Sequence, residues 1–466
     1  MHYYIRNISH NTDVKPNILF ILVDSLRSDG CYGERRTSKT PNFDRLVNNG
    51  AFFTTSISPA ASTAVSLGSI FTGLFPFKTG MSDTKYQKLD PNVENYISLF
   101  EQDGYSTHAT QSELTNLFDI TSGFKFQVNA KKYDNFLSLF DGLGEKLLDK
   151  INSLKSETPW LFYIHLNDLH QPISVPQKFI DSACGSTTYD KMISAIDYWI
   201  GKIISLINLD ETLVVITSDH GEYVRSIIKN GVDINLESSN LEKFLWNLGN
   251  KIPPVFYPPK QKLAKILQTV RMNQRKEKIK KLNLTSNEIR SLVSARTNPG
   301  HHMFDDTLVT PLLFCGFGVN KNRIVSQQVR NIDIFPTIAQ LCKINDTLIS
   351  NGKSLVPFIN GEIIHEEPAY IESMPATQKN MKIIGVRTSK FKYFREKKDR
   401  LNSSLYDLKN DPGEKFNVVK NLPQIAEEME NILQKILEDA DDKKTNILKD
   451  AERIKIEEEL RKLGYI

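Results

Sequence analysis

The sequence lacks the features of several protein classes. It has only four cysteines in 466 residues; Cys31, Cys184, Cys315 and Cys342 show no CxxC or metal-ligand spacing, so we expect reduced, structural thiols. The N-terminal apolar run NILFILV ends at Asp24 and is far too short to span a bilayer, and no export signal is evident. We therefore expect a cytoplasmic protein without a membrane span.

The chain also lacks a strong charge of one sign. Its 59 Lys and Arg residues against 55 Asp and Glu residues give a net charge of +4, which is too small to indicate a nucleic-acid partner or a membrane surface. With 40% hydrophobic and 24% charged residues, it has the composition of a globular protein that is long enough for more than one structural unit. The oligomeric state is left open by these features.

Continuous apolar segments alternate with amphipathic ones. The apolar segments are NILFILV (17–23), WLFYI (160–164), LVVIT (213–217) and TPLLFCGFGV (310–319). Such continuous runs are typical of strands buried on both faces of a parallel sheet. Segments between them, such as 189–207, repeat apolar residues at intervals of three and four, as amphipathic helices do. The pattern predicts an α/β fold with a large, mostly parallel sheet flanked by helices.

The pattern divides the chain into three parts. Residues 1–350 are expected to form the large α/β domain, with a basic helical insertion at about 223–300. Short strands and turns in 351–422 predict a small antiparallel C-terminal subdomain, and 423–466 predict charged C-terminal helices. The insertion has a Lys- and Arg-rich stretch at 260–281. It is either a solvated helical excursion or oligomer contact, or a lid for an anionic substrate.

Polar residues gather at the ends of the predicted strands. They are Asp24 after the first, His165, Asp168 and His170 in and after the second, Asp219 and His220 after the third, and His301 and His302 before the fourth. A single Asp there is more often a turn former or a helix N-cap. Because the carboxyl ends of parallel strands meet at one edge, the clusters together favour a metal site. His165 lies in the apolar run and is interpreted as a buried structural histidine.

Eight blocks of the sequence resemble the sulfatase family of the alkaline phosphatase superfamily. They are NILFILVDSLRSDGCYG, TPNFDRLVNNGAFF, FTGLFP, HLNDLHQP, TSDHGE, NIDIFPTIAQL, GVRTSKFKYF and LYDLKNDPGEKFNVV. They occur in the family's order and cover nearly the whole chain apart from about 223–300. The resemblance implies the alkaline phosphatase-like fold and an enzyme that hydrolyses phosphoric or sulfuric esters.

The stretch SPAASTAVSLGSIFTG (58–73) is where the nucleophile is expected. Sulfatases have a Cys or Ser in a C/S-x-P/A-x-R signature, modified to formylglycine, at a fixed distance before a Thr-Gly pair. Counting back from Thr72-Gly73 gives Thr63, which resembles the Thr-nucleophile members of the superfamily. Ser62 is the rival, because it keeps the S-x-A spacing, although Ser66 stands where Arg is expected. Either residue could also simply cap the following helix.

Two departures from the sulfatases indicate phosphoryl chemistry. The family's Asp-Asp pair appears as Asp24-Ser25, and its Asp-Asn pair appears as Asp219-His220. Losing a carboxylate and gaining an imidazole favours Zn²⁺ or Mn²⁺ over Ca²⁺. The family's Gly-Lys-Trp-His block, which acts on the sulfate group, is absent.

The resemblance assigns roles to single residues. Asp24, Asp219, His220 and the Thr63 oxygen are expected to hold one divalent metal ion. Asp29 is expected to orient a ligand. His170 and either His301 or His302 are expected to bind ester oxygens or to protonate the leaving group.

These assignments predict a metal-dependent hydrolase that cleaves phosphate mono- or diesters through a covalent Thr63 intermediate. The substrate is expected to be a small-molecule or glycan anionic ester. Three alternatives stay open: a sulfatase that uses Ser62, a transferase that moves a phospho-substituent onto a surface polysaccharide, and a non-enzymatic binding or scaffold relative with a decayed site.

Overall fold

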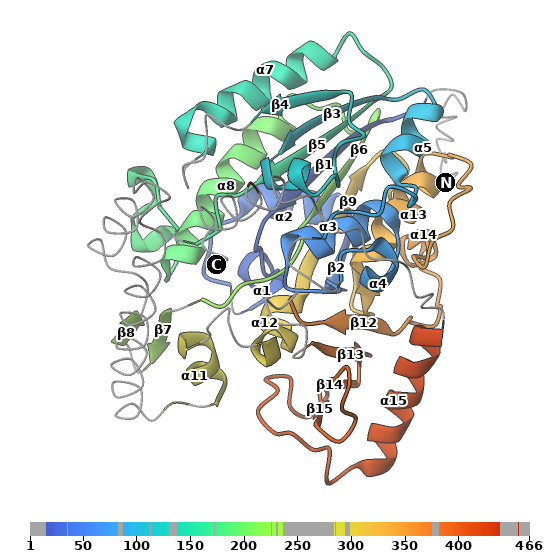
Figure 1. Ribbon diagram of the computed structural model, residues 1–466. Helices are drawn as coiled ribbons and strands as arrows, with labels where there is room; N and C mark the ends of the chain where they lie inside the picture. The colour runs from blue at the N-terminus through green and yellow to red at the C-terminus, as the bar shows by residue number, and fades with distance from the viewer. Residues whose placement is uncertain are drawn as a thin grey trace, which may run out of the picture.

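The computed structural model shows the alternation of strands and helices that the apolar pattern predicts (Figure 1). It describes residues 15–34, 36–82, 87–111, 113–129, 138–171, 173–224, 226–229, 232–235, 284, 286–293, 299–374, 382–438 and 455. The Lys- and Arg-rich stretch 260–281 and most of the predicted C-terminal helical segment beyond residue 438 lie outside these residues.

Within the described residues, the main sheet has nine strands in the order β10-β2-β9-β6-β1-β5-β3-β4, with β11 beside β2. Their bounds are β1 (Asn17–Val23), β2 (Gly50–Ile57), β3 (Ser106–Gln111), β4 (Phe126–Asn129), β5 (Trp160–Leu166), β6 (Thr212–Thr217), β9 (Val309–Gly316), β10 (Arg323–Val325) and β11 (Val329–Arg330). Among the described pairings of this sheet, those of β9 with β2 and β6 are antiparallel and the others are parallel. The predicted large, mostly parallel sheet is confirmed.

Helices cover both faces of this sheet. In β1, Ile18, Phe20 and Leu22 pack into one core cluster, and the residues that alternate with them pack into a second cluster on the other face. The first face is covered by α3 (Thr63–Thr72), α5 (Tyr96–Gln102), α13 (Ile334–Leu341) and α14 (Val356–Asn360), and the second by α1 (Ser28–Cys31), α2 (Pro41–Asn48), α7 (Gly144–Leu154) and α8 (Thr188–Ile204). Burial on both sides explains why the strands read as continuous apolar runs.

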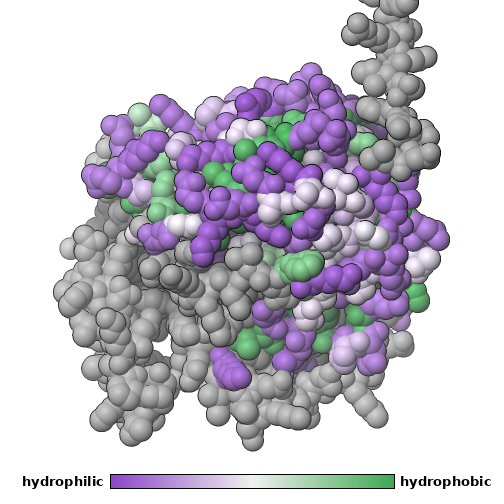
Figure 2. Space-filling view, turned by 90° about the horizontal axis from the view of Figure 1, so that it is seen from above, coloured by the Kyte–Doolittle hydropathy of each residue, from purple (hydrophilic) through white to green (hydrophobic). Residues whose placement is uncertain are grey.

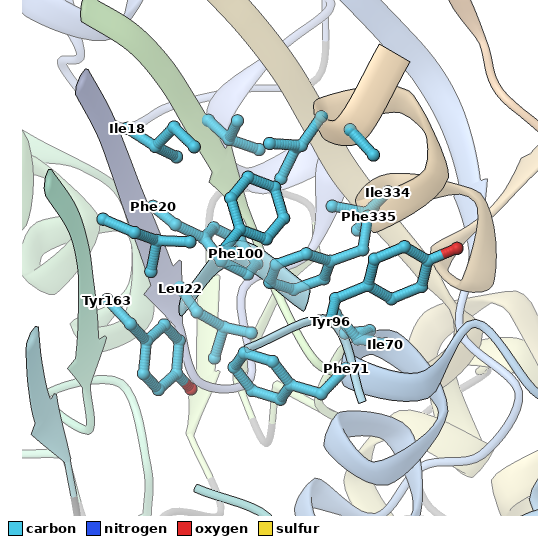
Figure 3. Close-up of a cluster of buried hydrophobic side chains, with 14 of the residues drawn as sticks. Ile18, Phe20, Leu22, Ile70, Phe71, Tyr96, Phe100, Tyr163, Ile334 and Phe335 are labelled. Atoms are coloured by element: carbon cyan, nitrogen blue, oxygen red, sulfur yellow. The ribbon is translucent and has the colours of Figure 1, made fainter. Parts of the chain in front are cut away.

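Aromatic side chains fix α3 against the strands (Figure 3). The ring of Phe71, in α3, lies 5.1 Å from that of Tyr163 on β5 and 6.2 Å from that of Phe20 on β1, measured between centroids. The ring of Phe335, in α13, closes the group at 5.1 Å from Phe71. Tilted and edge-on aromatic pairs of this kind contribute beyond their buried area. They hold α3 in place, and its first residue is Thr63.

A second, smaller sheet follows the main one. Its strands β12 (Ala369–Glu372), β13 (Ile383–Arg387), β14 (Phe391–Glu396) and β15 (Ser403–Asp407) are all antiparallel. One face is covered by α15 (Pro423–Glu438) through buried Met429 and Leu433, and the other packs on Phe304. The predicted small antiparallel subdomain is confirmed; its boundary at residue 350 stays a prediction, since Phe358 of α14 lies in the main core.

Further elements connect these parts of the chain, beside the short helical turns η2 (Leu139–Leu143), η3 (Gln177–Phe179), η4 (Ser182–Cys184) and η7 (Asn331–Asp333). They are α4 (Pro76–Thr79), α6 (Glu113–Leu117), the hairpin of β7 (Ser226–Lys229) and β8 (Val232–Asn235), α11 (Ser286–Val293), η6 (Pro299–Met303) and α12 (Asp305–Leu308). Viewed from above, the described surface is mostly hydrophilic, with apolar residues in small groups (Figure 2). None of the helices in the described residues is long and apolar enough to cross a membrane.

Candidate active site

Three neighbouring strands bring the polar clusters together. In the order β6-β1-β5, all three run parallel, and Leu22 on β1 is in register with both Thr217 on β6 and His165 on β5. Their carboxyl ends therefore lie at one edge of the sheet, where Asp24 and Asp219 follow two residues after Leu22 and Thr217. Since alternate residues share a face, Asp24 and His165 lie on the face that α3 covers.

Each buried carboxylate has one oxygen engaged by the protein and one directed toward the other site residues. Asp24 Oδ1 accepts a hydrogen bond from Ser25 Oγ at 2.6 Å, and Asp219 Oδ1 accepts from the amides of Ser25 and His220 at 3.1 and 2.9 Å. Asp24 Oδ2 accepts from Thr63 Oγ1 at 3.3 Å. Asp219 Oδ2 is buried and makes no hydrogen bond with the described residues.

His165 joins this group. It is buried, as expected, but its Nε2 lies 3.6 Å from Asp24 Oδ2, and neither ring nitrogen has a hydrogen-bond partner among the described residues. Asp24, His165 and Asp219 each offer one ligand atom, and these three atoms lie within 4.8 Å of one another. Buried polar atoms rarely stay unsatisfied. The orphaned atoms fit a divalent cation, so His165 is better placed for the site than its interpretation as a structural histidine suggested.

His220 brings an imidazole next to the predicted nucleophile. Its Nδ1 lies 2.8 Å from the carbonyl oxygen of Gly221 and donates a hydrogen bond to it. In the neutral ring, Nε2 therefore carries the lone pair that can bind a metal ion. Nε2 lies 3.3 Å from Thr63 Oγ1 and 3.4 Å from Asp219 Oδ2. Glycine is needed at 221, because a Cβ there would lie 2.4 Å from the carbonyl oxygen of Asp306.

The electrostatics of the two carboxylates differ. Burial opposes ionisation of Asp24, but the surrounding His165, His170 and His220 hold its pKa well below the usual range. Burial and the neighbouring Asp24 raise the pKa of Asp219. Two carboxylates so close repel each other when both are ionised, and a bound cation would remove that repulsion.

Ser62 and Thr63 have different surroundings. Ser62 occupies the N-cap position of α3, but its side chain forms no capping hydrogen bond there. Thr63, the first residue of the helix, is buried, and its hydroxyl contacts both Asp24 and His220. Ser66, one turn further, donates its hydroxyl to the carbonyl of Asp219 at 2.6 Å and ties α3 to the turn after β6. Thr63 is thus the hydroxyl that contacts the carboxylate and the imidazole, and the choice of nucleophile between Thr63 and Ser62 stays a prediction.

The structure gives fewer contacts for the other predicted histidines, His170, His301 and His302. His170 is buried, its Nδ1 lies 3.0 Å from the carbonyl of Gln171, and its charge acts on Asp24. His302 is buried in η6, and its carbonyl accepts from the Thr307 hydroxyl. The side chain of His301 lies outside the described residues. The catalytic roles of these three residues stay predictions.

Asp29 reaches the site only indirectly. Its half-exposed carboxylate pairs with Arg27 at 2.6 Å, and Arg27 also pairs with Asp306 at 3.0 Å and points to the carbonyl of Glu222 at 3.5 Å. Asp29 can thus influence the turn after His220 through Arg27, and its orienting role stays a prediction.

Two residues to which the sequence analysis assigned no role in the site hold it together. Ser25 hydrogen-bonds both carboxylates from a left-handed backbone conformation, with φ of 63°. Asn331 donates its side-chain amide to the carbonyl of Ser218 at 3.1 Å and accepts from the Ser56 hydroxyl at 2.7 Å. The sequence marked Ser25 only as the replacement of the family's second aspartate, and it gave no signal for Asn331.

Comparisons with known proteins agree with this architecture. The family model described as Sulfatase matches residues 16–344, and one described as N-sulphoglucosamine sulphohydrolase, C-terminal, matches residues 300–443. Arylsulfatase K of Rattus norvegicus is 21% identical over 459 residues, which cover 91% of this chain and 78% of that protein.

Solved structures share the fold. The structure of BT4656 in complex with its substrate D-glucosamine-2-N,6-O-disulfate has a TM-score of 0.62 at 16% identity and covers 92% of this chain and 100% of that one. The phosphonate monoester hydrolase of Agrobacterium radiobacter has a TM-score of 0.65 at 16% identity and covers 91% of this chain and 96% of that one. At such identity, these likenesses concern the fold.

Proposed function

Because the chain belongs to the sulfatase family and is thus a hydrolase acting on ester bonds, we propose that it hydrolyses sulfuric esters carried by a glycan. Support comes from the relatives: arylsulfatase K aligns along nearly the whole chain, and BT4656 binds a sulfated glucosamine as its substrate. These relatives favour sulfuric esters over the phosphoric esters that the sequence departures indicated.

The observation that carries the proposal is the buried group of Asp24, Asp219, His220 and Thr63 at the carboxyl edge of the sheet. When bound, a divalent ion supplies Lewis-acid stabilisation of the negative charge on the reacting ester. The family binds such an ion, and the nitrogen donors of this chain favour Zn²⁺ or Mn²⁺ over Ca²⁺.

The side chains divide the remaining work. Asp24, Asp219 and His220 would hold the ion, and Thr63 would present its hydroxyl to the ester. Asp24 Oδ2 and His220 Nε2, each 3.3 Å from Thr63 Oγ1, orient that hydroxyl. His170, with His301 or His302, would bind ester oxygens or protonate the leaving group, roles that suit the pKa of imidazole.

A second candidate is the hydrolysis of phosphoric or phosphonic monoesters through a covalent Thr63 intermediate. The position of Thr63 favours it. Threonine cannot become formylglycine, because its Cβ carries a methyl group, whereas its unmodified hydroxyl can attack phosphorus directly. The likeness to the phosphonate monoester hydrolase of Agrobacterium radiobacter also supports this candidate.

One experiment separates the two candidates. Turnover of an aryl sulfate, an aryl phosphate and an aryl phosphodiester is measured with protein loaded with Zn²⁺ or Mn²⁺, beside Thr63→Ala and Ser62→Ala. Sulfate turnover in the wild type supports the leading proposal. Loss of that turnover in Ser62→Ala, with the mass of formylglycine at Ser62, would make Ser62 the nucleophile. Turnover of phosphate esters alone, abolished by Thr63→Ala, would replace the leading proposal by the second candidate.

A further inference from the structure

We propose that His165 is a ligand of the divalent ion and that it supplies the donor lost where the family's second aspartate is replaced by Ser25. The inference rests on the proposed function only in that it requires a resident metal ion. It changes the expected ligand set, which did not include His165.

Ser25 holds the two remaining carboxylates in place. Its hydroxyl donates to Asp24 Oδ1 at 2.6 Å, and its amide donates to Asp219 Oδ1 at 3.1 Å. Its carbonyl accepts from the Tyr189 hydroxyl at 2.7 Å. All three polar groups of Ser25 are thus engaged in linking the carboxylates to each other and to α8. A serine in this arrangement orients the ligands and leaves one coordination position to another residue.

The fold places His165 at that position. It is the last but one residue of β5, beside β1, and it faces the side of the sheet where α3 presents Thr63. Its ring is buried, and neither ring nitrogen has a hydrogen-bond partner among the described residues. Asp219 Oδ2 also has none among them. The nearest carboxylate oxygen, Asp24 Oδ2, lies 3.6 Å from Nε2, which is beyond hydrogen-bond distance, so a shared cation would satisfy both atoms.

The distances suit ligands of one ion. His165 Nε2 lies 3.6 Å from Asp24 Oδ2, His220 Nε2 lies 3.4 Å from Asp219 Oδ2, and Thr63 Oγ1 lies 3.3 Å from Asp24 Oδ2. Ligands bound at about 2 Å in a tetrahedral arrangement are separated by roughly 3.3 Å. Asp24, His165 and Asp219, whose ligand atoms lie within 4.8 Å of one another, therefore need only small shifts to share an ion, and His220 Nε2 lies beside Asp219.

The resulting donor set suits the metal ions that we expect at this site. Two imidazole nitrogens and two carboxylate oxygens are a set that Zn²⁺ and Mn²⁺ accept, whereas Ca²⁺ requires six to eight oxygens. The alternative is that His165 acts only as a positive charge that balances Asp24, without touching the ion. The two possibilities predict different metal binding.

The test uses Co²⁺, whose visible absorption reports its ligands, on the full chain. Wild type, His165→Gln and the control His108→Gln are titrated, with folding checked by circular dichroism. His108 suits the control because it is equally buried, on the neighbouring β3, and pairs with Glu157. We expect His165→Gln to weaken Co²⁺ binding at least tenfold and to change the absorption bands, and His108→Gln to leave both unchanged.

A second measurement does not depend on any variant. X-ray absorption of the Zn²⁺-loaded wild type should show two imidazole ligands, and only one if His220 is the sole histidine ligand. A single imidazole, or wild-type Co²⁺ affinity and spectrum in His165→Gln, would overturn the proposal. These readouts need no substrate, so a protein that binds metal through two imidazoles but cleaves no ester would refute only the proposed function.

Discussion

At the scale of single residues, the site depends on which oxygen of each carboxylate the protein engages. Ser25 takes Oδ1 of both Asp24 and Asp219, which leaves Oδ2 of each toward Thr63 and His220. It does so from a backbone φ of 63°, a region that costs a non-glycine residue roughly 1–2 kcal/mol. The strain at Ser25 is therefore part of how the ligands are oriented.

Paired substitutions separate the strain from the hydrogen bond. Ser25→Ala and Ser25→Gly both remove the hydroxyl that donates to Asp24, but only glycine relieves the left-handed conformation. We expect Ser25→Ala to be less stable than Ser25→Gly by about 1 kcal/mol in urea unfolding. Both should bind Co²⁺ more weakly than the wild type. Equal stability of the two variants would contradict the strain argument.

At the scale of elements, a buried ionic cluster joins the small sheet to the segment that carries the histidine pair. Asp305, at the start of α12 and just after η6, pairs with Arg387 of β13 at 2.7 Å and with Lys392 of β14 at 2.5 Å. Burial opposes ionisation of Asp305, but the two cations hold its pKa well below the usual range. The small sheet thereby anchors the chain three residues from His302.

Asp305→Asn should destabilise the protein by about 2 kcal/mol at pH 7, because it removes the charged partner of Arg387 and leaves buried Lys392 with Glu414, 2.5 Å away, as its counter-charge. The depressed pKa means that the wild-type stabilisation is complete above the unfolded-state pKa of 3.8 and is lost as the pH falls below it. The difference between wild type and variant, measured by urea unfolding, should therefore shrink below about pH 4.

Two further variants check this prediction. Adding Lys392→Met to Asp305→Asn should lower the stability further, because it leaves the buried Glu414 carboxylate without its cation. Asp103→Asn, which breaks the more exposed pair of Lys15 and Asp103, should cost less than about 1 kcal/mol. A double variant more stable than Asp305→Asn would show that the pair of Lys392 and Glu414 does not stabilise this cluster.

At the scale of the whole molecule, the site connects parts that are far apart in the sequence. Asp24, His165 and Asp219 come from three adjacent strands, and Thr63 comes from the helix above them. The turn after β6 is joined to α3 by the hydrogen bond from Ser66 to Asp219, and to the segment after β11 by the hydrogen bond from Asn331 to Ser218. An ion bound here would stabilise only the folded chain, in which these ligands are assembled.

Removal of the metal should therefore lower the thermal stability of the entire chain. At a Zn²⁺ concentration 100 times its Kd, the folded state gains about 2.7 kcal/mol, and a chelator removes that gain. We expect a fall of several degrees in Tm on chelation, reversed by Zn²⁺ and absent in Asp219→Asn. A Tm that is the same with and without chelator would show that no such ion is bound.

The sequence by itself determined the architecture and the edge at which the site lies. Continuous apolar runs can be buried only between two layers of helices, and parallel strands must end on the same side. Asp24 and the Asp219-His220 pair could be located for that reason, and the Thr-Gly spacing led to Thr63, which the structure places beside Asp24 and His220.

Only the tertiary structure decided which side chains meet. Periodicity gives the face of the sheet that His165 occupies. It does not give the position of β5 beside β1, with His165 in register with Leu22. From the sequence alone, an imidazole in an apolar run is therefore interpreted as structural. Ser25 and Asn331 each make hydrogen bonds to residues that are far away in the sequence. Such contacts depend on strand order and on the direction of individual oxygen atoms, which residue types and spacing do not specify.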